Sequence, residues 1–328
     1  MEFPFEKRKY EVYKRGEEQT NPEWGKKPQD RSMEELLDYG LIILNKPAGP
    51  TSHQTVDFLK NILNIDKAGH SGTLDPNVTG VLVITLGKAT RVVEVLLHGG
   101  KEYICLMHLH APVEESLIRT TIKDYMGKIE QMPPKRSAVK RQLRTREIYY
   151  LEILEIEGKD VLFRVGCEAG TYIRTLCVDL GKKMNSRGHM QELVRSKVCT
   201  FTDKEWVTLH DLKDAWEEYK EGNDTTIRKI IHPFERAVAH IPKIYVSDFA
   251  VDSIAHGAFL SVPGIVKVES DIDIGDTVAL MSLKGELVGI STAKMNAQNI
   301  WKQQKGVAVG ETKVFIDLGV YPRYKKNE

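Results

Sequence analysis

The sequence predicts an α+β protein, in which a larger domain with a mixed, largely antiparallel sheet precedes a small C-terminal β-barrel. Three observations lead to this prediction. The 328 residues suffice for two domains of ordinary size. Before Pro242, helical and strand-like periodicities alternate irregularly and include adjacent hairpins, which does not fit a doubly wound sheet. After Pro242, short strands are separated by glycine-containing and charged turns, as in a small barrel.

These patterns divide the chain into three segments. They are an N-terminal arm (residues 1–37), the larger domain (residues 38–241) and the barrel (residues 242–322). The arm is charged and has little apolar periodicity, which is typical of disorder. The alternative is that Tyr10, Tyr13 and Trp24 dock it onto a folded surface.

The larger domain is predicted to begin with a strand at Gly40–Asn45, which ends at the turn formers of Lys46–Pro50. Thr51 and Gln54 then have the spacing of a capping box. Apolar residues recur at helical spacing from there until about Asn64. The sequence therefore predicts a strand, a tight turn and a helix in this order.

Further strands and one helix follow in the larger domain. A buried strand is expected at Val81–Leu86, and strict alternation predicts another at Lys101–His110. Strands at Tyr149–Glu155 and Val161–Val165 form a hairpin, and Tyr172–Met184 reads as a helix. In the barrel, we expect strands at Ile265–Val268, Thr277–Met281, Leu287–Ser291 and Val314–Ile316.

Composition excludes several classes of protein. The net charge of +1 indicates no class of partner, so only local charge is informative. No apolar run approaches the 18 residues of a membrane span, and the N-terminus lacks an apolar signal segment. The four cysteines are far apart and form no Cys-x-x-Cys pair. We therefore expect an intracellular protein with reduced thiols, no metal site and no membrane association.

The most informative segment is the loop Gly69–Pro76, with the sequence GHSGTLDP. Its small residues let the backbone approach a ligand closely, and its one carboxylate, Asp75, precedes a proline. An aspartate in such a place is usually a turn former. A phosphate-binding P-loop does not fit, because the Lys-Ser/Thr ending and the preceding strand are missing.

Together with Thr79–Leu82, this loop resembles the catalytic motif of the TruB family of pseudouridine synthases. Other segments resemble further motifs of the family, in the same order along the chain. They are Leu44–Ser52, Lys101–Tyr103, Gly170–Leu176 and Glu192–Arg195. The resemblance covers roughly residues 38–200. It implies the family's catalytic fold, and an enzyme that isomerises uridine in RNA to pseudouridine.

The resemblance also implies roles for individual residues. Asp75 is the catalytic carboxylate, acting as nucleophile or as base. Arg174 holds this carboxylate in its charged form through a bidentate fork. Tyr103 and Tyr172 stack on the extruded base. His70 lies near the flipped nucleotide, Leu193 belongs to the closing leucine motif, and Lys46 and Pro47 brace the catalytic loop. Read without the resemblance, the tyrosines would be core residues and His70 a loop histidine bonded to backbone.

A basic stretch precedes the hairpin. Its cations are Lys135, Arg136, Lys140, Arg141, Arg144 and Arg146, with no acidic residue among them. Such a concentration of charge suits RNA phosphates, although a solvated hairpin is the alternative. The segment between Lys140 and Tyr149 is shorter than the substrate clamp of family members that act alone on transfer RNA.

The short clamp and the basic stretch resemble the dyskerin-type branch of the family, the catalytic subunits of box H/ACA guide-RNA particles. The C-terminal barrel resembles a PUA RNA-binding domain, on which the arm of relatives packs. The missing basic tail indicates the archaeal form, located in the cytoplasm. This resemblance implies a guide RNA, a target RNA and three small accessory proteins, one of them a kink-turn binder. It implies no cofactor and no metal.

Two alternatives remain open at this point. One is a stand-alone transfer-RNA pseudouridine-55 synthase, since PUA domains also bind acceptor stems. The other is a non-catalytic scaffold of the particle. The short clamp argues against the first alternative, and the intact Asp75, Arg174 and Tyr103 argue against the second.

Overall fold

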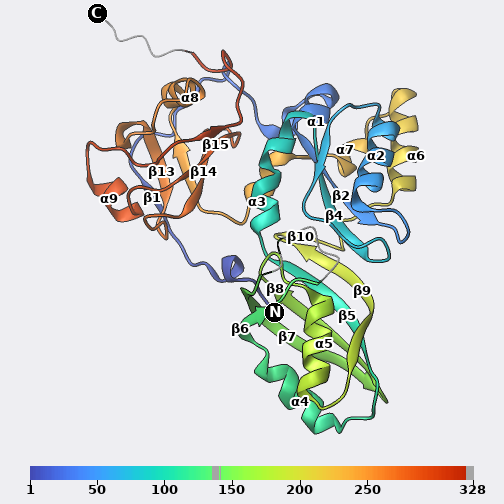
Figure 1. Cartoon of the computed structure of the whole chain (residues 1–328). Helices are drawn as coiled ribbons and strands as arrows, with labels where there is room; N and C mark the ends of the chain where they lie inside the picture. Colours follow the sequence, from blue (N-terminus) through green and yellow to red (C-terminus); the bar gives the residue numbers. More distant parts are fainter. Residues whose placement is uncertain (135–139, 141, 323–328) are drawn as a thin grey trace, which may run out of the picture. The chain divides into compact units, whose positions relative to one another are not determined.

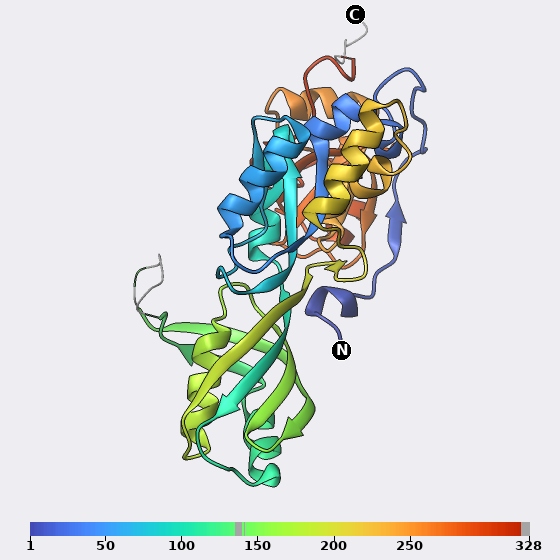
Figure 2. The same ribbon diagram turned by 90° about the vertical axis from the view of Figure 1, so that its right-hand side faces the viewer.

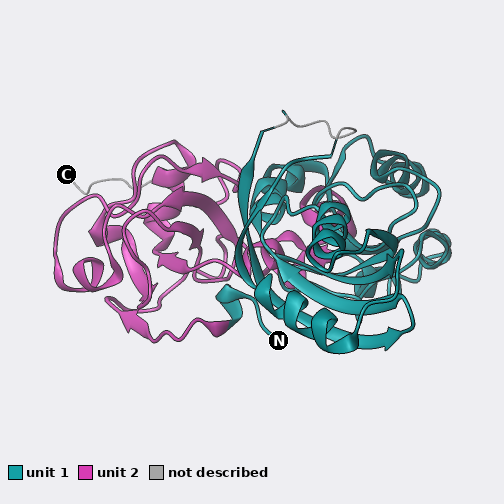
Figure 3. Ribbon diagram, turned by 60° about the horizontal axis from the view of Figure 1, so that its bottom comes forward, with its two compact units in different colours: residues 1–6, 41–231 teal, residues 7–40, 232–328 magenta. Residues whose placement is uncertain are grey.

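The structure, a computed structural model, describes residues 1–134, 140 and 142–322. Its packing separates two units, coloured differently in Figure 3. Unit 1 consists of residues 1–6 and 41–231. Unit 2 consists of residues 7–40 and the C-terminal part of the chain from residue 232. Each unit has its own sheet and is described by itself.

The sheet of unit 1 has the strand order β2-β4-β9-β5-β8-β7-β6. The strands are β2 (Gly40–Lys46), β4 (Thr79–Leu86), β5 (Lys101–Leu109), β6 (Gly127–Gln131), β7 (Arg144–Glu157), β8 (Asp160–Cys167) and β9 (Gly188–Val198). The short strands β3 (Ala68–His70) and β10 (Phe201–Thr202) pair with β4 and β9. Within this order β4 and β9 run parallel, whereas the other pairs are antiparallel. The predicted α+β class with a mixed, largely antiparallel sheet is confirmed.

Helices pack on two parts of this sheet, one around β2 and β4 and the other from β5 to β8. The helices α2 (Ser52–Leu63) and α6 (Leu209–Lys220) contact each other beside β2 and β4, whereas α4 (Glu115–Asp124) and α5 (Ile173–Lys183) pack on the β5–β8 part (Figure 1). Apolar residues of β5, β8 and α5, including Cys105, Phe163 and Leu176, form the core beneath α4 and α5. Figure 2 shows β5 and β9 as the long pair of strands that joins the two parts. Two short helices, α3 (Val93–His98) and α7 (Ile227–Ile230), complete unit 1.

Local signals explain the start of unit 1. The Thr51 hydroxyl accepts a hydrogen bond from the Gln54 amide, and the Gln54 side chain accepts one from the Thr51 amide. This capping box starts α2 as predicted. The helix ends at Asn64, which adopts the left-handed conformation with φ 53°.

Unit 2 contains a six-stranded sheet in the order β1-β13-β12-β14-β15-β16. The strands are β1 (Val12–Lys14), β12 (Lys243–Val246), β13 (Ile265–Glu269), β14 (Thr277–Met281), β15 (Leu287–Thr292) and β16 (Lys313–Val314), and the helices are α1 (Met33–Tyr39), α8 (Asp248–Ala255) and α9 (Ala297–Lys302). The strands predicted from Ile265 to Ser291 are present, and β16 is shifted slightly from the predicted Val314–Ile316. The whole chain also contains a few short elements, which belong to both units. They are β11 (His232–Pro233) and 3₁₀ helices at Pro4–Lys7, Pro28–Asp30, Gly87–Val92, Phe234–Val238 and Val262–Gly264.

Most of the N-terminal arm is folded into unit 2. The strand β1 pairs antiparallel with β13, placing Tyr13 opposite Val268. Arg8 forms ion pairs with Glu269 and Asp271, both at 2.7 Å. The buried pair Arg31–Glu235 joins the end of the arm to the beginning of the C-terminal part. These contacts give the arm long-range partners that its own composition does not reveal.

The described residues contain no helix long and apolar enough to cross a membrane.

Candidate active site

The loop Gly69–Pro76 is held from several sides in unit 1. The Ser52 hydroxyl at the start of α2 accepts a hydrogen bond from the Leu74 amide at 2.9 Å. The buried Ser71 hydroxyl accepts one from the Val83 amide of β4 at 3.1 Å. Lys46, fully buried at the end of β2, donates to the Pro76 carbonyl oxygen at 3.0 Å and also to those of Pro47 and Val78. The loop therefore presents Asp75 from a rigid frame.

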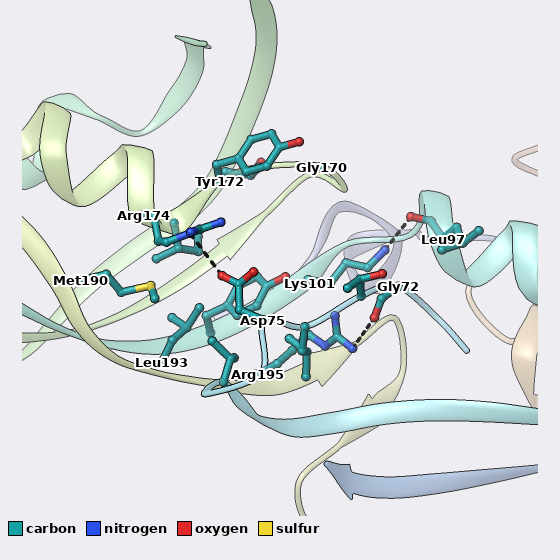
Figure 4. A pocket seen from close by; sticks show the side chains of 16 residues that line it. Gly72, Asp75, Leu97, Lys101, Gly170, Tyr172, Arg174, Met190, Leu193 and Arg195 are labelled. Carbon is teal, nitrogen blue, oxygen red and sulfur yellow. Dashed lines mark hydrogen bonds and ion pairs between the residues drawn. The ribbon is translucent and has the colours of Figure 1, made fainter. Parts of the chain in front are cut away.

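Asp75 faces a pocket of about 620 Å³ (Figure 4). Its lining comes from the loop, from β5 and β9, and from the segment that leads into α5. The lining residues are Gly72, Thr73, Leu74, Asp75, Val78, Leu97, Lys101, Tyr103, Gly170, Thr171, Tyr172, Ile173, Arg174, Met190, Leu193 and Arg195. Among these residues Asp75 is the single acid, and it shares the pocket with three cations, Lys101, Arg174 and Arg195.

Asp75 and Arg174 form an ion pair across this pocket. Arg174 Nε lies 3.2 Å from Asp75 Oδ2, and the two side chains point toward each other in Figure 4. The recorded contact between the two groups runs through Arg174 Nε. Arg174 is in the first turn of α5 and approaches the carboxylate with its Nε edge. Both side chains keep more than two-fifths of their surface exposed, so solvent or a ligand can reach the carboxylate.

The other two cations are buried in the pocket wall. Lys101 Nζ donates hydrogen bonds to the carbonyl oxygens of Leu96, Leu97 and Gly99 at 2.6–2.9 Å, which satisfies the C-terminal end of α3. Arg195 is 1% exposed and also donates to carbonyl oxygens, those of Gly72 and Val81. Such groups are paired with oxygen acceptors because an unpaired buried cation is costly.

Burial changes the ionisation of several groups around the loop. It lowers the pKa of Lys101 to about 8 and also lowers the pKa of Lys46. It raises the pKa of the Tyr103 hydroxyl, so this phenol stays neutral. Burial, with smaller contributions from His53 and Arg195, lowers the pKa of His70 to about 4. His70 is therefore a neutral imidazole at physiological pH.

The structure brings five of the eight predicted site residues into the pocket. These are Asp75, Tyr103, Tyr172, Arg174 and Leu193. Tyr172 is the N-cap residue of α5 and has an extended backbone, so the helix begins one residue later than predicted.

The three other predicted residues lie elsewhere. His70 Nδ1 accepts a hydrogen bond from the Gly72 amide at 3.3 Å, and its ring packs edge-on against His53. Lys46 and Pro47 line a second, smaller pocket of about 410 Å³. Lys46 bonds to the loop at Pro76 and also interacts electrostatically with Asp75.

The basic stretch is described in part. Lys135, Arg136 and Arg141 lie outside the described residues. Lys140 is exposed, and Arg144 and Arg146 are half-buried on the same face of β7. A side chain added at Gly170 would meet Arg146 at 3.2 Å, so Arg146 lies at the rim of the pocket.

The sequence patterns indicate no role for Lys101 and Arg195, although both residues belong to segments that resemble family motifs. One signal was available for Lys101. Alternation along β5 places Lys101 and Tyr103 on the same face, since residues two apart point the same way. No comparable signal identifies Arg195, because its acceptors, Gly72 and Val81, are distant in the chain.

This arrangement suits a flat, uncharged ring attached to an anionic backbone. Tyr103, Tyr172, Leu193 and Met190 offer aromatic and apolar faces, and the cations attract phosphate. One carboxylate is available for nucleophilic or base chemistry. The described residues contain no group of three or more His, Cys, Asp or Glu side chains that could hold a metal ion.

Comparison with known families identifies the fold of nearly the whole chain. Residues 60–173 match the N-terminal domain of TruB family pseudouridylate synthases, and residues 174–239 match the tRNA pseudouridylate synthase B C-terminal domain. A probable tRNA pseudouridine synthase B of Pyrococcus abyssi is 52% identical over 95% of this chain and 94% of its own length. The chain belongs to the TruB family of pseudouridine synthases. A family member of the same name from Methanopyrus kandleri is 47% identical over 98% of this chain and 95% of its own.

Both ends of the chain also match known domains. Residues 242–314 match the PUA domain and residues 1–56 the DKCLD domain. Among solved structures, a chain of a Cbf5–Nop10–Gar1 complex has a TM-score of 0.93 and 50% identity, with 98% of both chains covered. A chain of an H/ACA RNP bound to a substrate RNA containing 2'-deoxyuridine has a TM-score of 0.92 and 47% identity, over 98% of this chain and 99% of that one. The predicted family and the PUA domain are confirmed.

Proposed function

We propose that this pseudouridine synthase is the catalytic subunit of an archaeal box H/ACA ribonucleoprotein and works in the cytoplasm. In this role it converts uridines of ribosomal RNA, and of some transfer RNAs, to pseudouridine at positions selected by a guide RNA. The observation that carries the proposal is the similarity over nearly the full chain, arm and PUA domain included, to chains from two such assemblies.

In the proposed reaction, Asp75 acts on a uridine that has been flipped out of its RNA. The bond between the anomeric carbon and the ring nitrogen breaks, the ring turns, and a new bond forms to carbon 5. Asp75 serves as nucleophile or as base, and the Arg174 charge stabilises the carboxylate. Tyr103, Tyr172 and Leu193 hold the ring, and stacking offsets part of the cost of extruding it.

The proposed partners are a guide RNA, a target RNA and three small accessory proteins, one of which binds kink-turns. One solved relative is a chain of a complex with Nop10 and Gar1, and another is a chain of an H/ACA RNP bound to a substrate RNA. In this proposal Lys140, Arg144 and Arg146, with Lys135, Arg136 and Arg141 from the same stretch, contact RNA phosphates near the pocket. In the same proposal His70 lies near the flipped nucleotide, and Lys46 and Pro47 brace the loop.

A second candidate function is that of a stand-alone transfer-RNA pseudouridine-55 synthase. The names of the curated relatives favour it, since they are called probable tRNA pseudouridine synthases B. The two functions use the same chemistry and differ in how the target uridine is chosen.

A reconstitution distinguishes the two functions. The full chain is incubated with accessory proteins and either a guide RNA paired to a ribosomal fragment or an unmodified transfer RNA without guide. Pseudouridine is mapped by mass spectrometry, and the Asp75→Asn chain serves as the inactive control. The proposal expects product at the guided position, lost when the guide is omitted. Product on transfer RNA alone, without guided product, would support the second function instead.

A further inference from the structure

Arg195 is the residue at which three parts of the active site meet. In the parallel ladder between β4 and β9, it pairs with Gly80. In the antiparallel ladder between β5 and β9, it pairs with Tyr103, at a point where the register shifts. One residue of β9 is therefore neighbour both to the strand that follows the catalytic loop and to the strand that carries a pocket tyrosine.

The side chain of Arg195 adds bonds to these backbone pairings. Nε donates to the Val81 carbonyl oxygen at 2.8 Å, and Nη2 donates to the Gly72 carbonyl oxygen at 3.0 Å (Figure 4). The Tyr103 hydroxyl also interacts with the guanidinium, and this interaction opposes the fall in the pKa of Arg195 that burial causes. The guanidinium thus spans from the loop, through β4, to Tyr103.

Burial of the charged Arg195 side chain costs free energy, because the guanidinium loses its hydration. Arg195 is 1% exposed, and the acceptors around its guanidinium, two backbone carbonyl oxygens and the neutral Tyr103 hydroxyl, are uncharged. A buried cation without a carboxylate partner contributes little to stability in return for its desolvation. Arginine suits the place because it stays protonated and has several donors in a fixed plane.

The other supports of the loop differ from Arg195. Ser52 bonds to Leu74, and Lys46 bonds to Pro76. Ser71, within the loop, bonds to Val83 of β4. None of these three supporting residues lines the pocket. Arg195 lines the pocket and reaches the loop at Gly72, three residues before Asp75. Gly72 has φ 125°, so a shift of its carbonyl group changes the path of the backbone toward Asp75.

We propose that Arg195 is a positioning residue for the isomerisation: it clamps the catalytic loop to Tyr103 and thereby sets how Asp75 faces a base that is stacked on the tyrosine. This inference rests on the proposed function. The clamp acts on the reaction step more than on RNA affinity, because the Arg195 guanidinium is buried and its hydrogen bonds go to the protein itself. A misplacement of about 1 Å is enough to reduce a rate about 100-fold.

The test compares Arg195→Met and Arg195→Lys with matched variants of another buried arginine, Arg31→Met and Arg31→Lys. Arg31 pairs with Glu235 in unit 2. With the full chain in the guided reaction, we expect kcat to fall about 100-fold for Arg195→Met and about 10-fold for Arg195→Lys, which keeps the charge but loses the two-point contact. We expect KM to stay within about twofold. The Arg31 variants should lower the melting temperature and leave kcat near the parent value.

A second readout does not depend on activity. Tyrosines are labelled with ¹³C at Cζ, and the Tyr103 resonance is assigned with Tyr103→Phe. Without Arg195 the effect of burial is unopposed, so the pKa of Tyr103 should rise in Arg195→Met and less in Arg195→Lys. A folded Arg195→Met chain with parental kcat, or with an unchanged Tyr103 titration, would overturn the clamp. If the parent chain makes no pseudouridine but the Tyr103 titration shifts as expected, the proposed function fails while the contact between Arg195 and Tyr103 stands.

Discussion

Arg174 Nε lies 3.2 Å from Asp75 Oδ2 at the open side of the pocket, and each side chain keeps more than two-fifths of its surface exposed. An exposed ion pair of this kind contributes at most about 1 kcal/mol to stability. The pair is therefore better suited to hold a reactive carboxylate in place than to hold the fold together. Changes at either residue should appear in activity before they appear in stability.

Replacing Asp75 with asparagine keeps the shape of the side chain and removes its charge. We expect no detectable pseudouridine from Asp75→Asn, with unchanged affinity for RNA, because the carboxylate is the single acid among the residues that line the pocket. The measurement is a single-turnover assay beside a filter-binding assay. Asp66→Asn, an exposed aspartate just before the loop, is the matched control and should behave like the parent. Residual turnover well above background in Asp75→Asn would assign the chemistry to another group.

Variants of Arg174 test whether its charge or its fork geometry supports Asp75. A lysine keeps the positive charge beside Asp75 and can therefore replace part of the contact. We expect Arg174→Lys to lose about 10-fold in kcat and Arg174→Met about 100-fold or more, the usual range for one electrostatic group in a site. Lys182→Met, at the exposed end of the same helix, should change kcat little. Equal losses in both Arg174 variants would show that the fork itself is required.

The lowered pKa of Lys101 predicts that kcat depends on pH in the alkaline range. Its folded pKa is about 8, lowered from 10.5 mainly by burial. Above pH 8 the folded chain loses this proton, and with it one of the three hydrogen bonds to Leu96, Leu97 and Gly99. We expect kcat to decline above about pH 8 in the parent, and to decline less in Lys101→Arg, which keeps its charge. If kcat of Lys101→Arg declines above pH 8 as steeply as that of the parent, Lys101 is not the cause of the decline.

The lowered pKa of Lys101 also makes the free energy of unfolding depend on pH in a definite direction. Between pH 8 and 10.5 the unfolded chain holds a proton on Lys101 that the folded chain has released. Stability rises with pH wherever the unfolded state binds more protons. The contribution of Lys101 to the free energy of unfolding therefore increases across this window and is constant below it. Urea unfolding of the parent and Lys101→Met at pH 7 and 10 measures the difference.

Gly80 should tolerate no side chain. Its φ is 113°, and a Cβ atom would lie 2.3 Å from the Arg195 carbonyl oxygen and 2.6 Å from the Arg195 backbone nitrogen. We expect Gly80→Ala to lower the free energy of unfolding by about 3 kcal/mol or more, since backbone atoms cannot move aside locally. Gly158→Ala is the control, because Gly158 also has a positive φ but open space around it, and should cost about 1 kcal/mol. Similar losses in the two variants would mean that β4 and β9 separate easily.

Sequence patterns predicted the elements whose causes are local. The capping box of Thr51 and Gln54 located the start of α2, alternation located β5, and the turns between short strands located β14. The helix α3 was not predicted, because its six residues carry too little periodicity. In the site, motif resemblance led to Asp75, Tyr103 and Arg174, which do lie together. Arg195 received no role because its acceptors are distant in the chain. Lys101 received none because its acceptors come together only at the end of α3, which was not predicted.

The pairing of β1 with β13 has a consequence for how the protein is made. The strand β1 contains Val12–Lys14 and leaves the ribosome early, whereas β13 begins at Ile265. During most of translation β1 has no partner, while all of unit 1 beyond Glu6 can emerge and fold. Closing this contact across nearly the whole chain is slow, so β1 is unpaired until β13 has been made, and the edge of β13 is exposed to other chains until the two strands pair. Newly synthesised chains that lack the N-terminal strand should therefore aggregate through unit 2 while their catalytic unit is already folded.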